Sequence, residues 1–65
     1  MLSYSYIVLG AGRQGTAAAY DLVRFGDAAR VTLADVDLGT ARTAADRVMR
    51  LTGRTIVEAA QIDVG

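Results

Sequence analysis

Three glycines near the amino end have the spacing of a turn that binds phosphate. They occupy positions 10, 12 and 15 of the segment 10–15, whose sequence is GAGRQG. In such a turn Gly10 permits a sharp exit from a strand, Gly12 allows close approach of a phosphate, and Gly15 lets a helix pack against the sheet. The amides of Arg13 and Gln14 would lie at a helix amino terminus, where the helix dipole favours an anion. The segment therefore predicts a pyrophosphate site.

An acidic residue twenty positions after Gly15 would select the nucleotide. Asp35 follows the apolar run 30–34. A carboxylate at the end of such a strand can accept hydrogen bonds from the adenosine ribose 2′-hydroxyl, and it repels a 2′-phosphate. NADP enzymes usually have an arginine just beyond this point, but here the next arginine is Arg42 and Asp37 adds negative charge. The expected cofactor is therefore NAD rather than NADP.

The hydrophobic pattern divides the chain into five segments that must position these residues. Apolar runs predict strands at 6–9, 30–34 and 56–62, and spacings of three and four predict helices at 13–25 and about 38–51. The first run is continuous, which predicts a strand buried on both faces. The order β-α-β-α-β implies right-handed crossovers and a parallel sheet. We therefore expect an α/β fold, one Rossmann-type half with strand order 3-2-1.

Side chains within and around the helices refine this prediction. The helix at 13–25 has Ala18, Leu22 and Phe25 on one stripe, with Ala19 and Val23 beside it. Its end is predicted to have a left-handed cap at glycine 26. The second helix is predicted to be capped by aspartate 37 at its start and ended by glycine 53.

Composition excludes several classes of protein. The 65 residues include no cysteine or histidine, which excludes disulfides and metal sites built on those ligands. Seven arginines alternate with seven acids and the net charge is zero, so no basic face for nucleic acid is expected. No apolar run approaches the length of a membrane span, and the first residues do not have the pattern of a secretory signal. A cytoplasmic location and no membrane partner are therefore expected.

The chain is expected to bind rather than to catalyse on its own. It has no nucleophile–base pair, and without histidine or lysine two common proton-transfer groups are missing, so no catalytic residue is assigned. Residues 1–65 show no linker or repeat, which predicts the amino-terminal portion of a dinucleotide-binding domain without an internal boundary. The first strand would have an open side, so we expect the remainder of a parent chain with a substrate domain, and a homo-oligomer is a further partner that such an open side would suit.

Two further positions have both a functional and a simpler interpretation. Asp63 and Val64 follow the third predicted strand, where an adenine is expected, but they fit a strand-end cap equally well. The Arg13 side chain can reach a phosphate oxygen or stack on adenine. Its simpler role is that of a solvated residue contributing only its backbone amide.

Several stretches together resemble the amino-terminal NAD(P)-binding domain of the saccharopine dehydrogenase-like family, particularly lysine 6-dehydrogenases. They are residues 7–12 (IVLGAG), 31–37 (VTLADVD) and 57–64 (VEAAQIDV). The resemblance implies an NAD-dependent oxidoreductase of amino-acid metabolism that oxidises an amine, lysine or a relative, by hydride transfer. Gly10, Gly12 and Gly15 carry over as the pyrophosphate turn and Asp35 as the ribose acceptor. NADP-dependent members carry serine-arginine-type sequences after the second strand, from which this chain departs.

Two other classes share parts of the pattern. Nucleotide-sensing regulatory domains of potassium transport systems, which are not enzymes, have a Gly-x-Gly-Arg-x-Gly turn that Arg13 matches. The stretch 38–54 is long for their second helix, and the end of the chain lacks their usual Gly-Asp. FAD-binding oxidoreductases more often end the second strand in glutamate, so Asp35 favours NAD.

Overall fold

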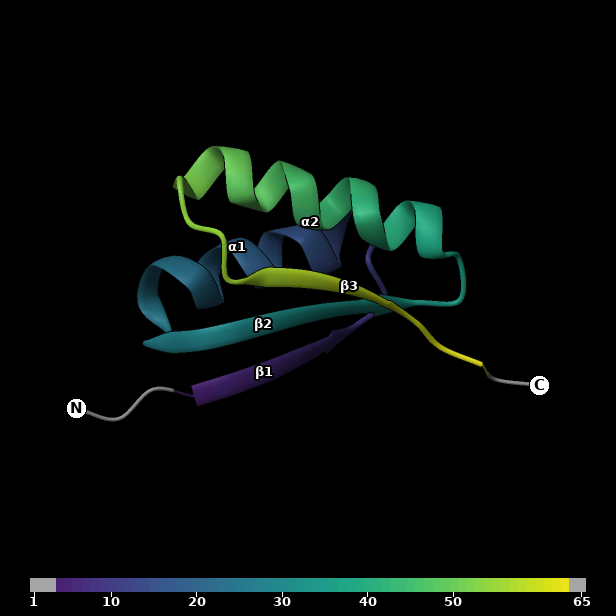
Figure 1. The fold of residues 1–65 in the computed structure, drawn as a ribbon, viewed down its shortest axis with the longest axis horizontal. Coiled ribbons are helices and arrows are strands. Elements are labelled where there is room, and N and C mark those ends of the chain that lie inside the picture. Colours follow the sequence, from purple (N-terminus) through teal and green to yellow (C-terminus); the bar gives the residue numbers. More distant parts are fainter. Residues whose placement is uncertain (1–3, 64–65) are drawn as a thin grey trace.

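Strands and helices alternate along residues 4–63, the part of the chain that the computed structural model describes. The order is the predicted one (Figure 1). The elements are β1 (Tyr4–Leu9), α1 (Arg13–Phe25), β2 (Ala28–Asp35), α2 (Leu38–Thr52) and β3 (Val57–Gln61). The second strand is longer than predicted because it begins at Ala28 and includes Asp35, while the third is shorter than the predicted 56–62. Neither helix of this described part is long and apolar enough to cross a membrane.

The three strands form one parallel sheet in the order β1-β2-β3, which confirms the predicted order 3-2-1. Leu9 pairs with Ala34 at the end of β1, and Asp35 pairs with Gln61 at the end of β3. The carboxyl ends of all three strands therefore meet at one edge of the sheet. The glycine-rich turn leaves from this same edge, as the sequence required.

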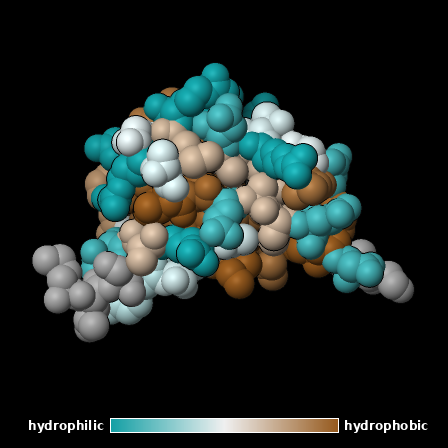
Figure 2. Space-filling model, in the orientation of Figure 1, coloured by the Kyte–Doolittle hydropathy of each residue, from teal (hydrophilic) through white to brown (hydrophobic). Residues whose placement is uncertain are grey.

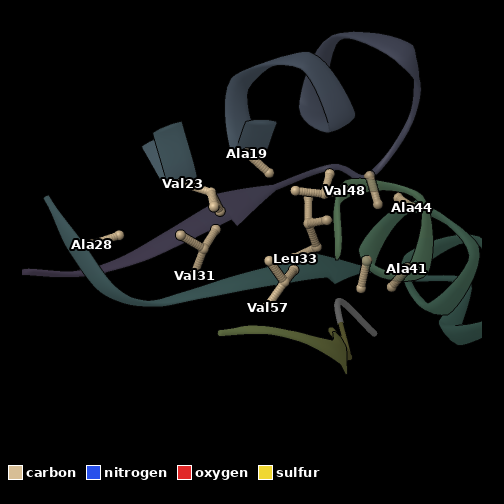
Figure 3. Packing of buried hydrophobic residues seen from close by; sticks show 11 residues of the cluster. Ala19, Val23, Ala28, Val31, Leu33, Ala41, Ala44, Val48 and Val57 are labelled. Atoms are coloured by element: carbon tan, nitrogen blue, oxygen red, sulfur yellow. The ribbon is translucent and has the colours of Figure 1, made fainter. Parts of the chain in front are cut away.

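Both helices cover the same face of the sheet (Figure 1). The chain moves in one direction across the sheet, and right-handed crossovers then place successive helices on one side. Figure 3 shows Leu33 of β2 pointing toward Val48 of α2, and Val31 pointing toward Val23 of α1. All four side chains are fully buried. The core is thus a single layer between the sheet and the helices.

Small residues let the helices approach the sheet closely. The buried positions of α2 are Ala41, Ala44, Ala45 and Val48, which have the spacings of three and four that predicted this helix. In α1 the buried residues are Ala19 and Val23, whereas the predicted stripe centred on positions 18, 22 and 25 is turned partly outward. The ring of Phe25 is exposed and lies beneath the Arg24 guanidinium, 5.1 Å from the ring centroid.

The opposite face of the sheet is uncovered within residues 4–63. Ile7 and Leu9 are 70% and 74% exposed, so the prediction that the first strand is buried on both faces is wrong for this part of the chain. Its alternate residues, Tyr6 and Val8, pack against the core. Ile7 and Leu9 are exposed because right-handed crossovers place both helices on the other face of the sheet. Figure 2 shows hydrophilic residues over the outer side of the helices and hydrophobic surface below the sheet.

The ends of α2 agree with the sequence. The Asp37 side chain accepts hydrogen bonds from the amides of Gly39 (2.9 Å) and Thr40 (3.3 Å), which confirms it as the N-cap. At the other end Gly53 is left-handed, with φ of 71°, and its amide donates to the carbonyl of Met49. A second carboxylate, Asp46, forms an exposed ion pair with the arginine four positions later. A side-chain N-cap such as Asp37 typically contributes about 1 kcal/mol to the stability of the fold.

The end of α1 differs from the prediction. Gly26 has φ of −90°, so it is not a left-handed cap, and the positive φ falls on Asp27 instead. A close approach explains the glycine, because an added Cβ would lie 2.8 Å from the carbonyl oxygen of Leu22. The Gly26 carbonyl also accepts a hydrogen bond of 2.7 Å from the Tyr6 hydroxyl. Glycine is therefore required here by volume rather than by conformation.

Replacing Leu33 by alanine tests the single-layer core. Leu33 is fully buried between the sheet and α2, so Leu33→Ala should lower the free energy of unfolding by about 2–5 kcal/mol. Leu51→Ala is the matched control, because Leu51 is 59% exposed on α2. Urea denaturation measures both variants. Equal midpoints for the two would contradict the assignment of Leu33 to the core.

Candidate functional site

The candidate site lies at the carboxyl edge of the sheet. One open hollow surrounds the β1–α1 turn and includes Gly10, Gly12 and Gln14. A second lies between the starts of α1 and α2 and is lined by residues including Gly12, Arg13 and Asp37. The two hollows share Gly12 and Arg13. Five of the predicted site residues therefore lie around one turn, namely Gly10, Gly12, Arg13, Gln14 and Gly15.

Gly10 is required by the path of the backbone. Its φ is +89°, a conformation that residues with a side chain rarely adopt. Its amide donates a hydrogen bond of 2.7 Å to the carbonyl of Ala34, so the ladder between β1 and β2 extends to this residue before the chain turns. Gly10 thus ends the strand and redirects the chain into α1.

Gly15 is required by packing. It lies in the first turn of α1, and an added Cβ would overlap the carbonyl oxygen of Gly10 and lie 2.9 Å from its carbonyl carbon. Both atoms belong to the backbone and cannot move aside without deforming the turn. Val8 of β1 is 3.6 Å from the same point. The glycine therefore allows the helix to start directly against the end of β1.

Gly12 has neither requirement. Its φ of −71° and ψ of −161° are accessible to any residue, and an added Cβ would meet no atom within 4 Å. It is the N-cap of α1, and its exposed backbone borders both hollows. The fold itself gives no reason for glycine at this position. An approaching ligand gives one, because a Cβ would fill the space in front of the helix start.

The start of α1 presents backbone donors to that space. The amides of residues 13–15 have no carbonyl partner within the helix, and the amide of Thr16 is the first to bond back, to the Gly12 carbonyl at 2.9 Å. The Thr16 hydroxyl also donates to this carbonyl at 2.9 Å, which gives it a structural role. Arg13 and Gln14 are exposed. The arrangement suits an anion at the helix amino terminus.

Asp35 joins the glycine turn to the turn that follows β2. One carboxylate oxygen, Oδ2, accepts a hydrogen bond of 2.8 Å from the Ala11 amide, and the other, Oδ1, accepts one of 2.9 Å from the Asp37 amide. These bonds, that from Ala11 foremost, hold the pKa of the Asp35 carboxyl below its ordinary value. Asp35 is therefore a carboxylate at neutral pH, and it lies beside the space in front of Gly12.

The third strand closes the edge of the site. The Ile62 amide donates to the Asp35 carbonyl at 2.9 Å, and the Gln61 side chain donates to the Val36 carbonyl at 3.1 Å. Asp63 follows as an exposed residue beyond β3. Val64 lies outside the described residues. Contact of either residue with an adenine therefore stays a prediction.

Sequence reasoning missed two features of the site. The Ala11 amide was not expected to bond to Asp35, because no sequence pattern reports contacts between a side chain and a backbone 24 residues away. Arg47, which belongs to no motif of the sequence, lines the hollow between the helices together with Arg13. Within residues 4–63 neither arginine side chain has a hydrogen bond or an ion pair. Arg47 is exposed on α2 and borders this hollow opposite residues of α1.

The parallel β-α-β-α-β order and the glycine turn at the carboxyl edge define a Rossmann-type half. No protein-family model and no curated protein matches the chain. Among solved structures, the chain is similar to quinate dehydrogenase from Corynebacterium glutamicum in complex with NAD, with 34% sequence identity and a TM-score of 0.82. The match covers 94% of this chain and 21% of that enzyme. The chain therefore spans about a fifth of the length of the dehydrogenase.

Two substitutions should distinguish the glycine that packing requires, Gly15, from the glycine that faces open space, Gly12. Gly15→Ala forces a backbone overlap with Gly10 and should lower the free energy of unfolding by at least 1–3 kcal/mol, roughly the cost of overpacking. Gly12→Ala meets no atom and should change it by less than about 1 kcal/mol. Denaturant unfolding measures both. A larger loss in Gly12→Ala than in Gly15→Ala would contradict the geometry of the turn.

The stabilising bonds to Asp35 should also be lost in acid. Because its pKa is lower in the folded state, the stabilisation is complete above the ordinary pKa and disappears as the pH falls through the lowered one. Asp35→Asn should therefore be less stable than the unmodified protein at neutral pH, and the difference should shrink between about pH 5 and pH 2. Unfolding followed at several pH values measures this. A difference that is independent of pH would contradict the assignment.

Proposed function

We propose that the chain binds the ADP portion of NAD as part of an NAD-dependent oxidoreductase. This proposal rests on one observation about position 12. The fold does not need a glycine there, and the backbone of Gly12 faces open space at the start of α1. The carboxylate of Asp35, at the end of β2, supplies an acceptor that is bonded directly to the Ala11 amide of this turn. The likeness to a dehydrogenase in complex with NAD supports the same conclusion.

Each group has a distinct role in this proposal. The amides of residues 13–15 and the dipole of α1 hold the pyrophosphate. Each oxygen of Asp35 accepts one backbone hydrogen bond, and its second lone pair is left to accept a ribose hydroxyl. Asp35 and Asp37 together disfavour the extra phosphate of NADP. When bound, NAD supplies the hydride acceptor of the reaction.

The substrate is proposed on separate grounds. The resemblance of the segments around Gly10, Asp35 and Gln61 to the saccharopine dehydrogenase-like family supports an amino acid of the lysine type. The structural likeness supports a second candidate, quinate or a similar compound. Reduction of NAD by the whole protein, followed by absorbance with lysine or with quinate, distinguishes them. Turnover of the amine alone would support the first.

Calorimetric titration tests the cofactor. We expect NAD to bind with a Kd at least about tenfold lower than that of NADP, since a 2′-phosphate would meet the Asp35 carboxylate and the added charge of Asp37. FAD and ATP are titrated alongside. Equal affinity for NAD and NADP would contradict the role given to Asp35. Tight binding of ATP with none of NAD would instead favour a nucleotide-sensing domain.

Gly12→Val tests the pyrophosphate contact itself. The valine side chain should occupy the space in front of α1 and abolish measurable NAD binding, while the fold remains intact because no protein atom lies within 4 Å of the new Cβ. Ala18→Val on the exposed side of α1 is the matched control and should bind NAD normally. NAD binding by a folded Gly12→Val protein at unchanged affinity would overturn the proposed site.

A further inference from the structure

We propose that Asp35 is a positioning residue for the pyrophosphate turn, in addition to any contact that it makes with a ribose. This inference rests on the proposed function and concerns the same site. Through the Ala11 amide, the carboxylate holds the turn between Gly10 and Gly12 in its binding conformation. Nucleotides that have no ribose hydroxyl for Asp35 to bind should therefore still depend on it.

The hydrogen bond from Ala11 ties the glycine turn to the end of β2. Gly10 donates to the backbone carbonyl of Ala34, which is the end of the ladder between β1 and β2. The next amide along the chain, that of Ala11, donates at 2.8 Å to the side chain of Asp35 rather than to a backbone carbonyl. The carboxylate thus replaces a backbone acceptor at the point where β1 leaves the sheet.

The turn has few other restraints. Gly10, with φ of +89°, has the broad conformational freedom of glycine, and Gly12 has no side chain. Ala11 between them is only 3% exposed, so its amide would lose its partner in a mostly buried position if the carboxylate were removed. The Ala11 carbonyl accepts only a long hydrogen bond of 3.4 Å, from the Thr16 hydroxyl. Besides the packing of the Ala11 side chain in the core, Asp35 therefore holds the turn through the Ala11 amide.

The two roles of the carboxylate are compatible. Oδ2 is bonded to the Ala11 amide and Oδ1 to the Asp37 amide, and a carboxylate has about four acceptor positions in all. A ribose hydroxyl would therefore add a bond to the carboxylate without displacing Ala11. Electrostatic repulsion has the opposite effect on affinity, because a carboxylate repels the phosphates of any nucleotide and its removal should strengthen binding. Whether Asp35→Ala weakens or strengthens the binding of a nucleotide without ribose hydroxyls therefore separates the two roles.

The test compares ADP with 2′,3′-dideoxy-ADP. Calorimetry on the whole protein gives the Kd of each nucleotide for the unmodified protein and for Asp35→Ala. We expect Asp35→Ala to raise the Kd of dideoxy-ADP by about three- to tenfold, the effect of losing one or two backbone hydrogen bonds. The Kd of ADP should rise by more. Asp46→Ala is the matched control, because it removes an exposed carboxylate of α2 without touching the glycine turn, and should not weaken dideoxy-ADP binding.

Hydrogen exchange provides a readout that needs no nucleotide. The Ala11 amide should exchange faster in ligand-free Asp35→Ala than in the unmodified protein, while core amides such as that of Leu33 remain protected. Asp35→Asn should give an intermediate rate, because its one side-chain oxygen can serve only one of the two amides well. An unchanged Ala11 rate in a folded Asp35→Ala protein would overturn the inference.

The outcomes also separate this inference from the proposed function. If the unmodified protein binds ADP, and Asp35→Ala weakens ADP but binds dideoxy-ADP equally or more tightly, then Asp35 acts on the ribose alone. That result overturns the positioning role and leaves the NAD site standing. If the unmodified protein binds neither nucleotide, the proposed function fails and the positioning role fails with it.

Discussion

The carboxylate of Asp35 is the point at which the carboxyl edge of the sheet is held together. Its two oxygens bond the amides of Ala11 and Asp37, and its backbone carbonyl bonds the amide of Ile62. One residue therefore connects the ends of all three strands and the starts of both turns. Charge, backbone geometry and candidate function consequently converge on a single side chain, which the hydrogen bonds keep ionised.

Elements determined by local pattern could be predicted from the sequence. The helical periodicity placed α2, and Asp37 and Gly53 marked its two ends because capping depends on the nearest few residues. Strand order followed from short connections and the handedness of crossovers. The glycine turn was placed for similar reasons, since Gly10 and Gly15 act on backbone atoms close to them in the chain. The approximate location of the candidate site therefore follows from the sequence.

Features that depend on distant contacts could not be predicted. Gly26 was expected to have a positive φ. Instead, a close contact with Leu22 requires a glycine at this position, and Asp27 is the residue with positive φ. The apolar run around Ile7 indicated burial on both faces, yet the two helices cover only one. The bond from Ala11 to Asp35 joins residues that only the assembled sheet brings together. In each case the decisive neighbour is fixed by tertiary structure.

The three glycines of the turn also differ in what natural selection can act upon. Gly10 is fixed by conformation and Gly15 by volume, so both contribute to the stability of the fold. Gly12 contributes nothing that another residue could not provide to the folded state. In a descendant that had lost its ligand, mutation would be free to replace Gly12 while the other two glycines persisted. The residue at position 12 would therefore record whether binding is still under selection.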